Sequence, residues 1–567
     1  MLGAWREEDG VKAATPNGFR DILPTEARAR ERISGVVREC FSAHGYEPIE
    51  TPLLETRSAL ERGGEIQDSP FQLFDADGSL LMVRPDLTLP IARLVSSRMS
   101  LDAGPVRLRY AAPVVREGSS LKGQPRQFTQ LGIELYAADG PSPEAEVVDL
   151  LACALRELAV PSWRIVCGSV SPLMSLLDEC VSDAGLREQI LSLVHQSDLV
   201  SLDDLVAAAD LPAPVARALR VVPRISGGTK VIEKIDAVLE AAGVPEGRRG
   251  TAELRAFASE VSDLFDAGRI SFDFSIINSF DYYTGVIFKG YSEGTTASIA
   301  SGGRYDAVLA NFGAEGVSAC GFALSLERLQ EVLGEQGESG VVTQGIAASE
   351  RPVRIAVPKG SLFKDSVRLL AAAGLPTGAL ADLGRKLIVR DGDYEYVIVR
   401  AQDAPAFVAH GGADCGICGY DSIFEAGHDL LQLVDLDFGG CRFVVAEPAA
   451  KAGAAEAAYS WRGTVRVATK YPRITQSYYD RIGQQVDIVT LHGNIELGPI
   501  VGMTDRIVDI TATGTTLAEN DLVIVDDVME CTARFFAGPA AYRTDERIRS
   551  LAERLAAAVA QTPREDQ

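Results

Sequence analysis

The stretch IVDITATGTTLAEN, residues 507–520, decides the fold of the C-terminal half of this sequence. Its apolar beginning predicts a buried strand that ends at Asp509 and Ile510, and the small residues that follow predict a tight loop. Small residues let successive backbone N–H groups converge on an anion, and threonine hydroxyls add donors. The carboxylate at the strand end can accept hydrogen bonds from ribose hydroxyls. The segment suits a sugar with a 5-phosphate, although an ordinary strand–turn–helix corner fits it equally well when it is taken alone.

Strand–helix alternation extends outward from this stretch. Apolar strands are predicted at VRIAV (353–357), YVIVR (396–400), VRVAT (465–469) and VDIVT (486–490). A segment with helical periodicity follows each of them. Repeated strand–helix units predict an α/β fold, with a parallel sheet covered by helices on both faces. Such sheets bind ligands at the carboxyl ends of their strands.

Polar residues at other strand ends are candidates for the same site. Lys359 follows the first of these strands in a turn, and Ser361 is predicted to cap the next helix. Lys470 follows the third strand. After the fourth strand, Asn494 is predicted to cap a helix with Glu496 in its first turn. A lysine at a helix start can pair with a diphosphate, and Glu496 can serve ribose hydroxyls or Mg²⁺. A solvated turn lysine and an acid that complements the helix dipole are open alternatives.

Five motifs occur in a fixed order along this half: VPKGSL, GRKLIV, RAQDAPAFVAHGGADCGICGYD, RVATKYPRI and LHGNIELGPIVGMTDRIVDITATGTTL. In this order they resemble short-form ATP phosphoribosyltransferase over nearly all of residues 352–562. The resemblance implies a two-lobed, periplasmic-binding-protein-like α/β domain. It also implies the first step of histidine biosynthesis, in which N1 of the adenine of ATP displaces pyrophosphate from 5-phosphoribosyl diphosphate. Mg²⁺ is expected to arrive with the diphosphate, without a dedicated protein cage.

The resemblance also assigns candidate residues. It makes Lys359 and Arg385 candidates for binding the diphosphate and Glu496 a candidate near the ribose, and these three are the expected catalytic residues. The expected phosphoribosyl loop comprises Asp509, Thr511, Ala512, Thr513, Gly514, Thr515 and Thr516. A transition state that resembles an oxocarbenium ion leaving a diphosphate requires positioning and charge neutralisation, and needs no nucleophilic side chain.

One position departs from the family pattern. The family usually has an arginine after the Lys-Gly pair, whereas this sequence has Ser361. A serine lacks the charge and the bidentate fork of a guanidinium group. Three hypotheses follow. The domain is a slower transferase or one that uses another cation, it is a phosphoribosyltransferase with a different acceptor in a specialised pathway, or it is a catalytically inactive nucleotide and amino-acid sensor.

The N-terminal half, residues 1–333, has a different organisation. Strand-like segments are followed by a helical block at about 174–265, after which strands return. This order predicts an antiparallel α+β sheet with a helical insertion. A last helix is expected to begin near Phe322. Residues 334–350 are rich in Gly, Ser and Gln, and predict a linker to the second domain, residues 351–567.

Motifs in this half resemble class II histidyl-tRNA synthetases over about residues 15–333: TPNGFRDILP, VRPDLTLPIAR, VVREGSSLKGQPRQFTQLGIELYA, FDYYTG, SGGRYDAVLANFG and GFALSLERL. The resemblance implies a six-stranded antiparallel core and a histidine pocket. The pocket residues carried over are Asp86, Thr88, Arg116, Gln130, Glu134, Tyr282 and Tyr283. Carboxylate and amide acceptors suit an α-amino group and an imidazole. Taken singly, each of these residues is also an ordinary polar residue of a sheet face.

Two features argue against tRNA charging. Residues 278–283 read NSFDYY where the synthetase reads RGLDYY, so Asn278 replaces the arginine expected to assist adenylate formation. The anticodon-binding domain is also replaced by the transferase. This combination resembles the regulatory subunit of the short-form enzyme, a synthetase paralogue that activates the catalytic partner and mediates inhibition by histidine. The resemblance therefore implies a fusion of both partners, with ATP, 5-phosphoribosyl diphosphate and histidine as ligands and a homo-oligomeric state. A functional histidyl-tRNA ligase is the remaining alternative.

Composition indicates which partners and which cellular location we expect for this protein. The 567-residue chain has a net charge of −24, which disfavours a long polyanion such as RNA. No long apolar run or apolar N-terminal signal core is present, so a cytoplasmic protein without a membrane segment is expected. The nine cysteines have no regular spacing. Cys415 and Cys418, with His410 nearby, lack the further ligand of a tetrahedral zinc site and are expected in the core.

Overall fold

The computed structural model describes residues 15–64, 71–101, 104–117, 125–138, 142–276, 283–334, 351–381, 383–511 and 515–561. The chain divides into two compact units. Unit 1 comprises Met1–His195 and Val206–Gly345, and unit 2 comprises Gln196–Leu205 and Ile346–Gln567. A ten-residue segment from within the first half therefore belongs to unit 2. The predicted linker lies outside the described residues, apart from Gly334.

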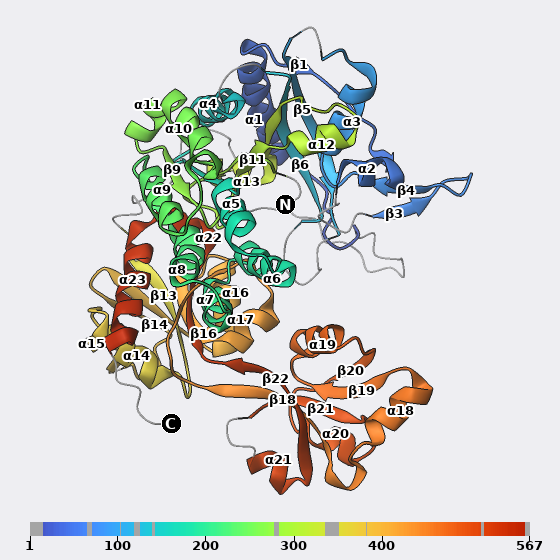
Figure 1. Ribbon diagram of the computed structural model, residues 1–567, viewed down its shortest axis with the longest axis vertical. Helices are drawn as coiled ribbons and strands as arrows, with labels where there is room; N and C mark the ends of the chain where they lie inside the picture. Colours follow the sequence, from blue (N-terminus) through green and yellow to red (C-terminus); the bar gives the residue numbers. More distant parts are fainter. Residues whose placement is uncertain are drawn as a thin grey trace, which may run out of the picture. The chain divides into compact units, whose positions relative to one another are not determined.

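A nine-stranded sheet has the order β1-β5-β6-β12-β11-β10-β7-β9-β8. It forms the centre of unit 1, and strands β5, β6 and β11 are labelled in Figure 1. Its strands are β1 (Glu47–Pro48), β5 (Val106–Val115), β6 (Gln127–Tyr136), β7 (Arg164–Ser169), β8 (Ser226–Gly227), β9 (Ile270–Asp273), β10 (Val286–Tyr291), β11 (Ala300–Arg304) and β12 (Ala319–Ser325). The six consecutive strands from β5 to β7 in the sheet order pair antiparallel with one another. These six strands form the predicted antiparallel core, and β1 and β9 join it in parallel.

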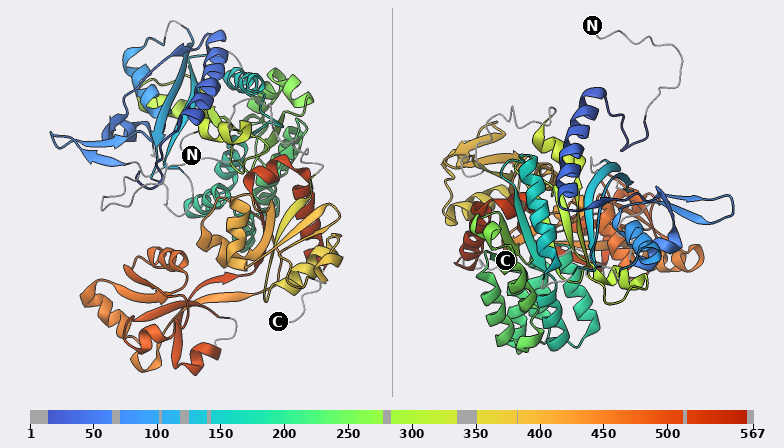
Figure 2. Two further views of the ribbon diagram at one scale, coloured as in Figure 1. Left: turned by 180° about the vertical axis from the view of Figure 1, so that it is seen from behind. Right: turned by 90° about the horizontal axis from the view of Figure 1, so that it is seen from above.

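Helices and a small arm complete the sheet-bearing part of unit 1. They are α1 (Pro24–Ala43), α2 (Arg57–Gly63), α3 (Thr88–Arg98), α4 (Pro143–Glu157), α12 (Asp306–Asn311) and α13 (Leu326–Leu333). A second sheet of β2 (Leu54–Thr56), β4 (Leu80–Val83) and β3 (Gln72–Phe74) is antiparallel. The hairpin of β3 and β4 projects away from the large sheet in both views of Figure 2.

The predicted helical insertion lies between β7 and β9. It consists of α5 (Ser171–Cys180), α6 (Ala184–His195), α7 (Leu199–Ala208), α8 (Ala213–Val221), α9 (Val231–Ala241), α10 (Thr251–Glu260) and α11 (Ser262–Asp266). The helix expected near Phe322 was placed too early. Phe322 is a buried residue of strand β12, and the helix begins only at Leu326. The apolar strand runs directly into the apolar face of α13, so periodicity alone does not mark the boundary.

Unit 2 contains two further sheets. A six-stranded sheet has the order β14-β15-β13-β16-β23-β17, and a five-stranded sheet has the order β20-β19-β21-β18-β22. The first consists of β13 (Val353–Pro358), β14 (Ile388–Asp391), β15 (Tyr394–Val399), β16 (Cys415–Gly419), β17 (Leu431–Asp435) and β23 (Ala533–Ala537). The second consists of β18 (Cys441–Pro448), β19 (Val465–Thr469), β20 (Val486–Thr490), β21 (Arg506–Thr511) and β22 (Leu522–Cys531).

These sheets are mixed, which corrects the prediction of a parallel sheet. Strands β13, β15 and β16 run parallel, as do β19, β20 and β21. Strands β14, β18, β22 and β23 pair antiparallel with their neighbours. The antiparallel strands went unpredicted because a sequence pattern gives the position of a strand and not its direction in the sheet.

We call the part built on the six-stranded sheet the first lobe and the part built on the five-stranded sheet the second lobe. The chain passes to the second lobe between β17 and β18 and returns between β22 and β23, as Figure 1 shows. The first lobe carries α14 (Phe363–Ala372), α15 (Gly378–Ala381), α16 (Ala404–Ala409), α17 (Tyr420–Ala426), α22 (Pro539–Thr544) and α23 (Glu546–Gln561). The second carries α18 (Ala454–Arg462), α19 (Pro472–Arg481), α20 (Leu497–Ile500) and α21 (Thr515–Glu519).

The core of the first lobe joins the sheet to its helices. Leu551 and Leu555 of α23 are fully buried against strand residues such as Ile355 and Phe535. Cys415 and Cys418 are also fully buried there, and burial raises the pKa of both thiols. Their surroundings are those of small core residues. In the described part of the chain, no helix has the length and apolar character needed to cross a membrane.

Candidate functional site

Three parallel strands of the second lobe end at one edge of its sheet. Thr469 at the end of β19 pairs with Thr490 of β20 and with Val508 of β21. The segments that follow these strands therefore begin side by side. They carry Lys470 and Glu496, and Asp509 lies in β21 itself, two residues before its last residue, Thr511. The structure thus brings together three residues that the sequence singled out separately.

The electrostatics of Asp509 agree with this placement. Burial raises the pKa of Asp509, the Glu496 carboxylate raises it further, and Lys470 opposes the shift. The Asp509 carboxylate also accepts the N–H of Ile510 at 2.8 Å. Asp509 and Glu496 are both half-buried. The edge therefore presents two neighbouring acids and one cation, a set that can bind ribose hydroxyls and compensate part of an anion's charge.

The predicted phosphoribosyl loop is only partly visible. Thr511 is the last residue of β21, and Thr516 is an exposed residue of the short helix α21. Ala512, Thr513 and Gly514 lie outside the described residues, as does the side chain of Thr515. The anion-binding function of this loop stays a prediction.

Lys359 and Arg385 lie at one edge of the first lobe's sheet. The N–H of Lys359, directly after β13, donates to the carbonyl of Val399 at 2.7 Å. One strand further, the N–H of Ile398 donates to the carbonyl of Leu387, two residues after Arg385, at 2.8 Å. Both cations are exposed. They are placed to meet a polyanion from solvent.

Two predicted helix caps are wrong. The N-cap of α14 is Leu362, no side chain caps that helix, and Ser361 is exposed before it. Helix α20 begins at Leu497, and its N-cap is Glu496 instead of Asn494. Asn494 has a φ of +49°, in the left-handed region, and uses its carbonyl, which accepts the Leu497 N–H at 3.1 Å. In both cases the helix begins later in the sequence than the predicted capping residue implies, because the turn before it is longer.

Sequence reasoning missed Asp421. This half-buried acid lies in the first turn of α17 in the first lobe. Burial raises its pKa, and Lys470 of the second lobe opposes that shift. Lys470 therefore interacts with an acid from each lobe, because Asp509 is its other partner. The Gly-Tyr-Asp turn after strand β16 is the signal that could have drawn attention to this position.

Unit 1 contains a second group of predicted residues, centred on Glu134. Its carboxyl group is 1% exposed and accepts hydrogen bonds from Thr88 Oγ1 at 2.8 Å and Tyr110 Oη at 3.2 Å, and also from Tyr305 Oη. Burial raises its pKa to about 8, and the three hydroxyl donors oppose this shift. Tyr110 and Tyr305 were not predicted, because Tyr110 lies in the neighbouring strand β5 and Tyr305 directly follows β11, so both reach Glu134 only through the pairing of strands in the sheet.

Strand β12 lies very close to the Glu134 carboxyl group. A Cβ on Gly321 would collide with the Glu134 carboxylate, so the neighbouring strand has room only for glycine. Gln130 lies four residues before Glu134 on the same face of β6. Its Oε1 is buried and, among the described residues, has no hydrogen-bond partner. A buried amide oxygen without a partner suggests a missing donor, such as a ligand N–H group.

The other predicted residues of unit 1 lie around the turn before α3. Asp86 Oδ1 accepts the N–H of Leu89 at 3.1 Å, and its charge acts on Glu134. Arg116 Nε donates to the carbonyl of Pro85 at 2.9 Å. The ring of Tyr283 packs against Gly303, where an added Cβ would lie 2.8 Å from it. Tyr282 and the departure at Asn278 lie outside the described residues.

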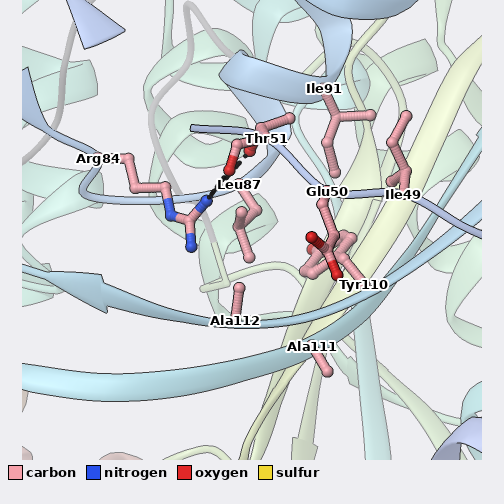
Figure 3. Close-up of a pocket in the computed structure, with 9 residues that line it drawn as sticks. All are labelled: Ile49, Glu50, Thr51, Arg84, Leu87, Ile91, Tyr110, Ala111 and Ala112. Carbon is pink, nitrogen blue, oxygen red and sulfur yellow. Dashed lines mark hydrogen bonds between the residues drawn. The ribbon is translucent and has the colours of Figure 1, made fainter. Parts of the chain in front are cut away.

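A small cavity borders this group. It has a volume of about 120 Å³, and Tyr110 forms part of its wall (Figure 3). Arg84 lies across it and donates from Nη1 to the carbonyl of Thr51 at 2.6 Å and to Thr51 Oγ1 at 3.2 Å. Arg84 is 5% exposed, and burial lowers its pKa. Its hydrogen bonds hold the backbone in place, so we interpret Arg84 as structural.

Comparisons with known proteins also divide the chain into two parts, a synthetase-like first half and a transferase-like second half. Residues 18–329 match the family described as Histidyl-tRNA synthetase, and residues 400–557 match the family described as ATP phosphoribosyltransferase. An ATP phosphoribosyltransferase of Rubrobacter xylanophilus is 48% identical over 193 residues, which are 34% of this chain and 89% of the relative. An ATP phosphoribosyltransferase regulatory subunit of Desulfitobacterium hafniense is 34% identical over 316 residues, 56% of this chain and 81% of the relative.

One solved structure adds to this result. The crystal structure of an ATP phosphoribosyltransferase regulatory subunit/histidyl-tRNA synthetase from Bacillus halodurans is similar, with a TM-score of 0.53 and 25% sequence identity. The similarity covers 69% of this chain and 100% of that chain. It supports the class II synthetase-like architecture of unit 1.

Proposed function

Because this chain belongs to the histidyl-tRNA synthetase family in its first half and to the ATP phosphoribosyltransferase family in its second, we propose that it unites a phosphoribosyltransferase with its own regulatory unit. The catalytic part is an ATP phosphoribosyltransferase of histidine biosynthesis. Relatives of the first half are regulatory subunits of that enzyme and relatives of the second half are the enzyme itself. The two parts are separate proteins in those relatives and one polypeptide here.

The reaction forms one bond and breaks another. N1 of the adenine of ATP bonds to C1 of the ribose of 5-phosphoribosyl diphosphate, and the C1–O bond breaks to release pyrophosphate. The observation that carries this assignment is the convergence of Lys470, Glu496 and Asp509 at the ends of β19, β20 and β21. We assign Asp509 and Glu496 to the ribose hydroxyls. Lys359 and Arg385 are assigned to the departing diphosphate, whose growing charge their ammonium and guanidinium groups would stabilise.

Mg²⁺ is proposed to enter with the diphosphate substrate. Asp509 and Glu496 offer the carboxylate oxygens that this ion prefers, and two acids suit a site completed by water and phosphate. When bound, the ion would neutralise charge on the leaving group. The protein's own contribution is to hold the ribose and orient it toward the adenine.

The group around Glu134 is proposed to bind histidine as an effector. A carboxyl group that accepts from three hydroxyls and a buried amide oxygen that lacks a partner suit the N–H groups of an α-amino or imidazole group. Histidine would lower the activity by binding the inhibited state more tightly than the active one. We also propose that the chain forms a homo-oligomer, and that the two lobes of unit 2 form a periplasmic-binding-protein-like pair.

Release of pyrophosphate is the decisive measurement. The full chain, with ATP, 5-phosphoribosyl diphosphate and Mg²⁺, is expected to release pyrophosphate and to form a product that carries the phosphoribosyl group on adenine. Replacing ATP by other heterocyclic acceptors tests acceptor identity, and adding histidine at millimolar concentration tests regulation. Absence of pyrophosphate release would contradict the catalytic assignment and favour a nucleotide sensor. A faster reaction with another acceptor would favour a specialised transferase.

A further inference from the structure

Residues 196–205 belong to unit 2, although they lie within the helical insertion of the synthetase-like half. The chain leaves unit 1 after His195 and returns to it at Val206. Ser197 has a φ of +55°, a left-handed conformation that is uncommon for residues other than glycine. A segment that leaves its own unit and adopts a strained turn is held by contacts made in unit 2.

The segment covers the edge of the first lobe's sheet. The carbonyl of Ser197 accepts the N–H of Gln432 at 3.1 Å, and Asp198 forms a parallel bridge with Gln432. Gln432 belongs to β17, the last strand of the six-stranded sheet. An edge strand has unpaired backbone groups that another segment can satisfy.

A buried ion pair forms the centre of this contact. Arg534 Nη1 donates to both carboxylate oxygens of Asp198, at 3.0 and 3.2 Å, and to Gln432 Oε1 at 2.7 Å. The side chains of Arg534 and Asp198 are 6% and 3% exposed. The guanidinium also stacks over the ring of Tyr420 at 3.7 Å. Without Asp198, the buried guanidinium would lose the carboxylate to which it is hydrogen-bonded, which is strongly unfavourable.

The same contact lies against both passages between the lobes. Arg534 is in β23, two residues after Thr532, where the chain returns from the second lobe. The Thr532 carbonyl accepts the N–H of Tyr420 at 3.0 Å. Thr532 Oγ1 donates at 2.8 Å to Asp435, the last residue of β17 before the outward passage. A shift of Arg534 would therefore also displace the two segments that connect the lobes, and the angle between the lobes depends on these segments.

We infer that residues 196–205 are the regulatory contact of the transferase, and that the Asp198–Arg534 pair transmits the state of unit 1 to the angle between the two lobes. The inference rests on the proposed regulation by histidine. Because the chain on both sides of the segment belongs to unit 1, a rearrangement of unit 1 pulls directly on Asp198. Arg534, Gln432 and Tyr420 form a surface that fits an aspartate. Asp198 is held in place for this contact at the start of its helix, because it also accepts the Ser201 N–H at 3.0 Å and the Ser201 hydroxyl at 2.8 Å. Asp198 acts as a positioning residue.

The test compares Asp198→Asn with wild type and with Asp210→Asn in the full-length chain. Asparagine keeps the shape and the oxygen acceptor of Asp198 but removes its charge, and Asp210 is an exposed acid on the same stretch of chain that undergoes the same change. Pyrophosphate release is measured over a series of histidine concentrations, and histidine binding is measured by calorimetry. In Asp198→Asn, histidine is expected to bind with wild-type affinity and yet to inhibit less than half as strongly at saturation. Asp210→Asn is expected to match wild type.

The outcomes separate this inference from the proposed function. A wild-type chain that does not release pyrophosphate contradicts the catalytic assignment, and one that ignores histidine contradicts the regulatory proposal and this inference with it. A regulated wild type with an equally inhibited Asp198→Asn variant overturns only this inference. Asp198→Glu keeps the charge and is expected to restore at least part of the inhibition. If Asp198→Asn does not fold, Ser201→Ala removes a milder contact of Arg534, at 3.3 Å, and unchanged inhibition of that variant would overturn the inference.

Discussion

At the scale of single residues, Glu134 shows how a buried carboxyl group of the proposed histidine site can oppose stability. Its carboxyl group is almost fully buried, and its pKa is raised from 4.5 to about 8. Between these two values the unfolded chain releases the proton and the folded chain keeps it, so stability falls as the pH rises. At pH 7 the cost is on the order of 3 kcal/mol, at about 1.4 kcal/mol per pKa unit. A position retained at this cost is a candidate for function.

Glu134→Gln is expected to remove this pH dependence. The melting temperature of the variant, relative to wild type, should increase steadily from pH 5 to pH 8, because glutamine has no proton to lose. Thermal unfolding at a series of pH values measures the difference. Above pH 8, where the wild-type carboxylate is charged, histidine binding to the variant should weaken by tenfold or more, since a charged hydrogen-bond partner contributes about 1.5–3 kcal/mol. A variant whose relative stability does not change with pH would show that Glu134 titrates normally in the folded chain.

Asp509 is the residue on which the ribose assignment depends most. Asp509→Asn is expected to lower kcat/KM for 5-phosphoribosyl diphosphate by on the order of 10²-fold, as is common when one preorganised group at a reaction centre is lost. Asp487→Asn provides a matched control, because Asp487 is an exposed acid in β20 of the same sheet. Steady-state kinetics of pyrophosphate release compare the two. Equal losses in both variants would mean that the effect comes from net charge.

Ser361 allows the departure from the family pattern to be tested directly. It is exposed, near Lys359, and makes no capping bond, so an arginine can be introduced without disturbing packing. Ser361→Arg is expected to raise kcat by roughly tenfold, because a hydrogen bond to a charged diphosphate contributes 1.5 kcal/mol or more. Ser361→Gln, long but uncharged, is the control. Unchanged turnover in Ser361→Arg would indicate that another cation already fulfils this function.

At the scale of helices and strands, the sequence predicts an element well when its burial is uniform. Strand β19, an apolar run that is buried at four of its five residues, was predicted at its observed bounds, Val465–Thr469. Strand β22 was not predicted, because five consecutive residues in its middle are exposed and no alternation marks it. Its position depends on pairing with β18. Lys470, Glu496 and Asp509 were found because each follows a recognisable strand, whereas Tyr305 reaches Glu134 only through the pairing of distant strands.

The C-terminal helix α23 should be essential for the stability of the first lobe. Leu555 is fully buried in it and packs in the cluster that includes Ile355 and Phe535. Leu555→Ala is expected to lower the free energy of unfolding by about 2–5 kcal/mol, as core leucine truncations do. Glu553→Ala, an exposed change in the same helix, should alter it by less than about 0.5 kcal/mol. Urea denaturation of both variants measures the difference, and similar values would contradict the proposed packing role of α23.

At the scale of the whole molecule, the two units share one polypeptide. Fusion replaces the association of separate subunits by a fixed, high effective concentration. The sequence predicted the two families and the order of the domains. It did not predict that residues 196–205 would fold with the second unit, because that placement depends on a buried ion pair between residues more than three hundred positions apart. No local sequence pattern predicts a contact between residues so far apart in the chain.

The net charge of −24 bears on the synthetase-like half as a whole. Phosphate affinity depends on lysine and arginine, so the chain is expected not to bind tRNA measurably at physiological salt. Purified protein incubated with tRNA, ATP and histidine should yield no histidyl-tRNA, and a filter-binding assay should detect no complex. Charging of tRNA would restore the ligase alternative. A functional histidyl-tRNA synthetase assayed in parallel shows that the tRNA is chargeable.

The double passage between the lobes limits how unit 2 can move. Two bodies joined by one flexible strand can rotate about it in any direction, but bodies joined by two adjacent paired strands resist twisting and can mainly bend. Opening and closing then amount to a single degree of freedom. A pair of spin labels, one on each lobe, is therefore expected to report one distance distribution that substrates shift along a single axis, so that a single measured distance would suffice to follow the state of the enzyme.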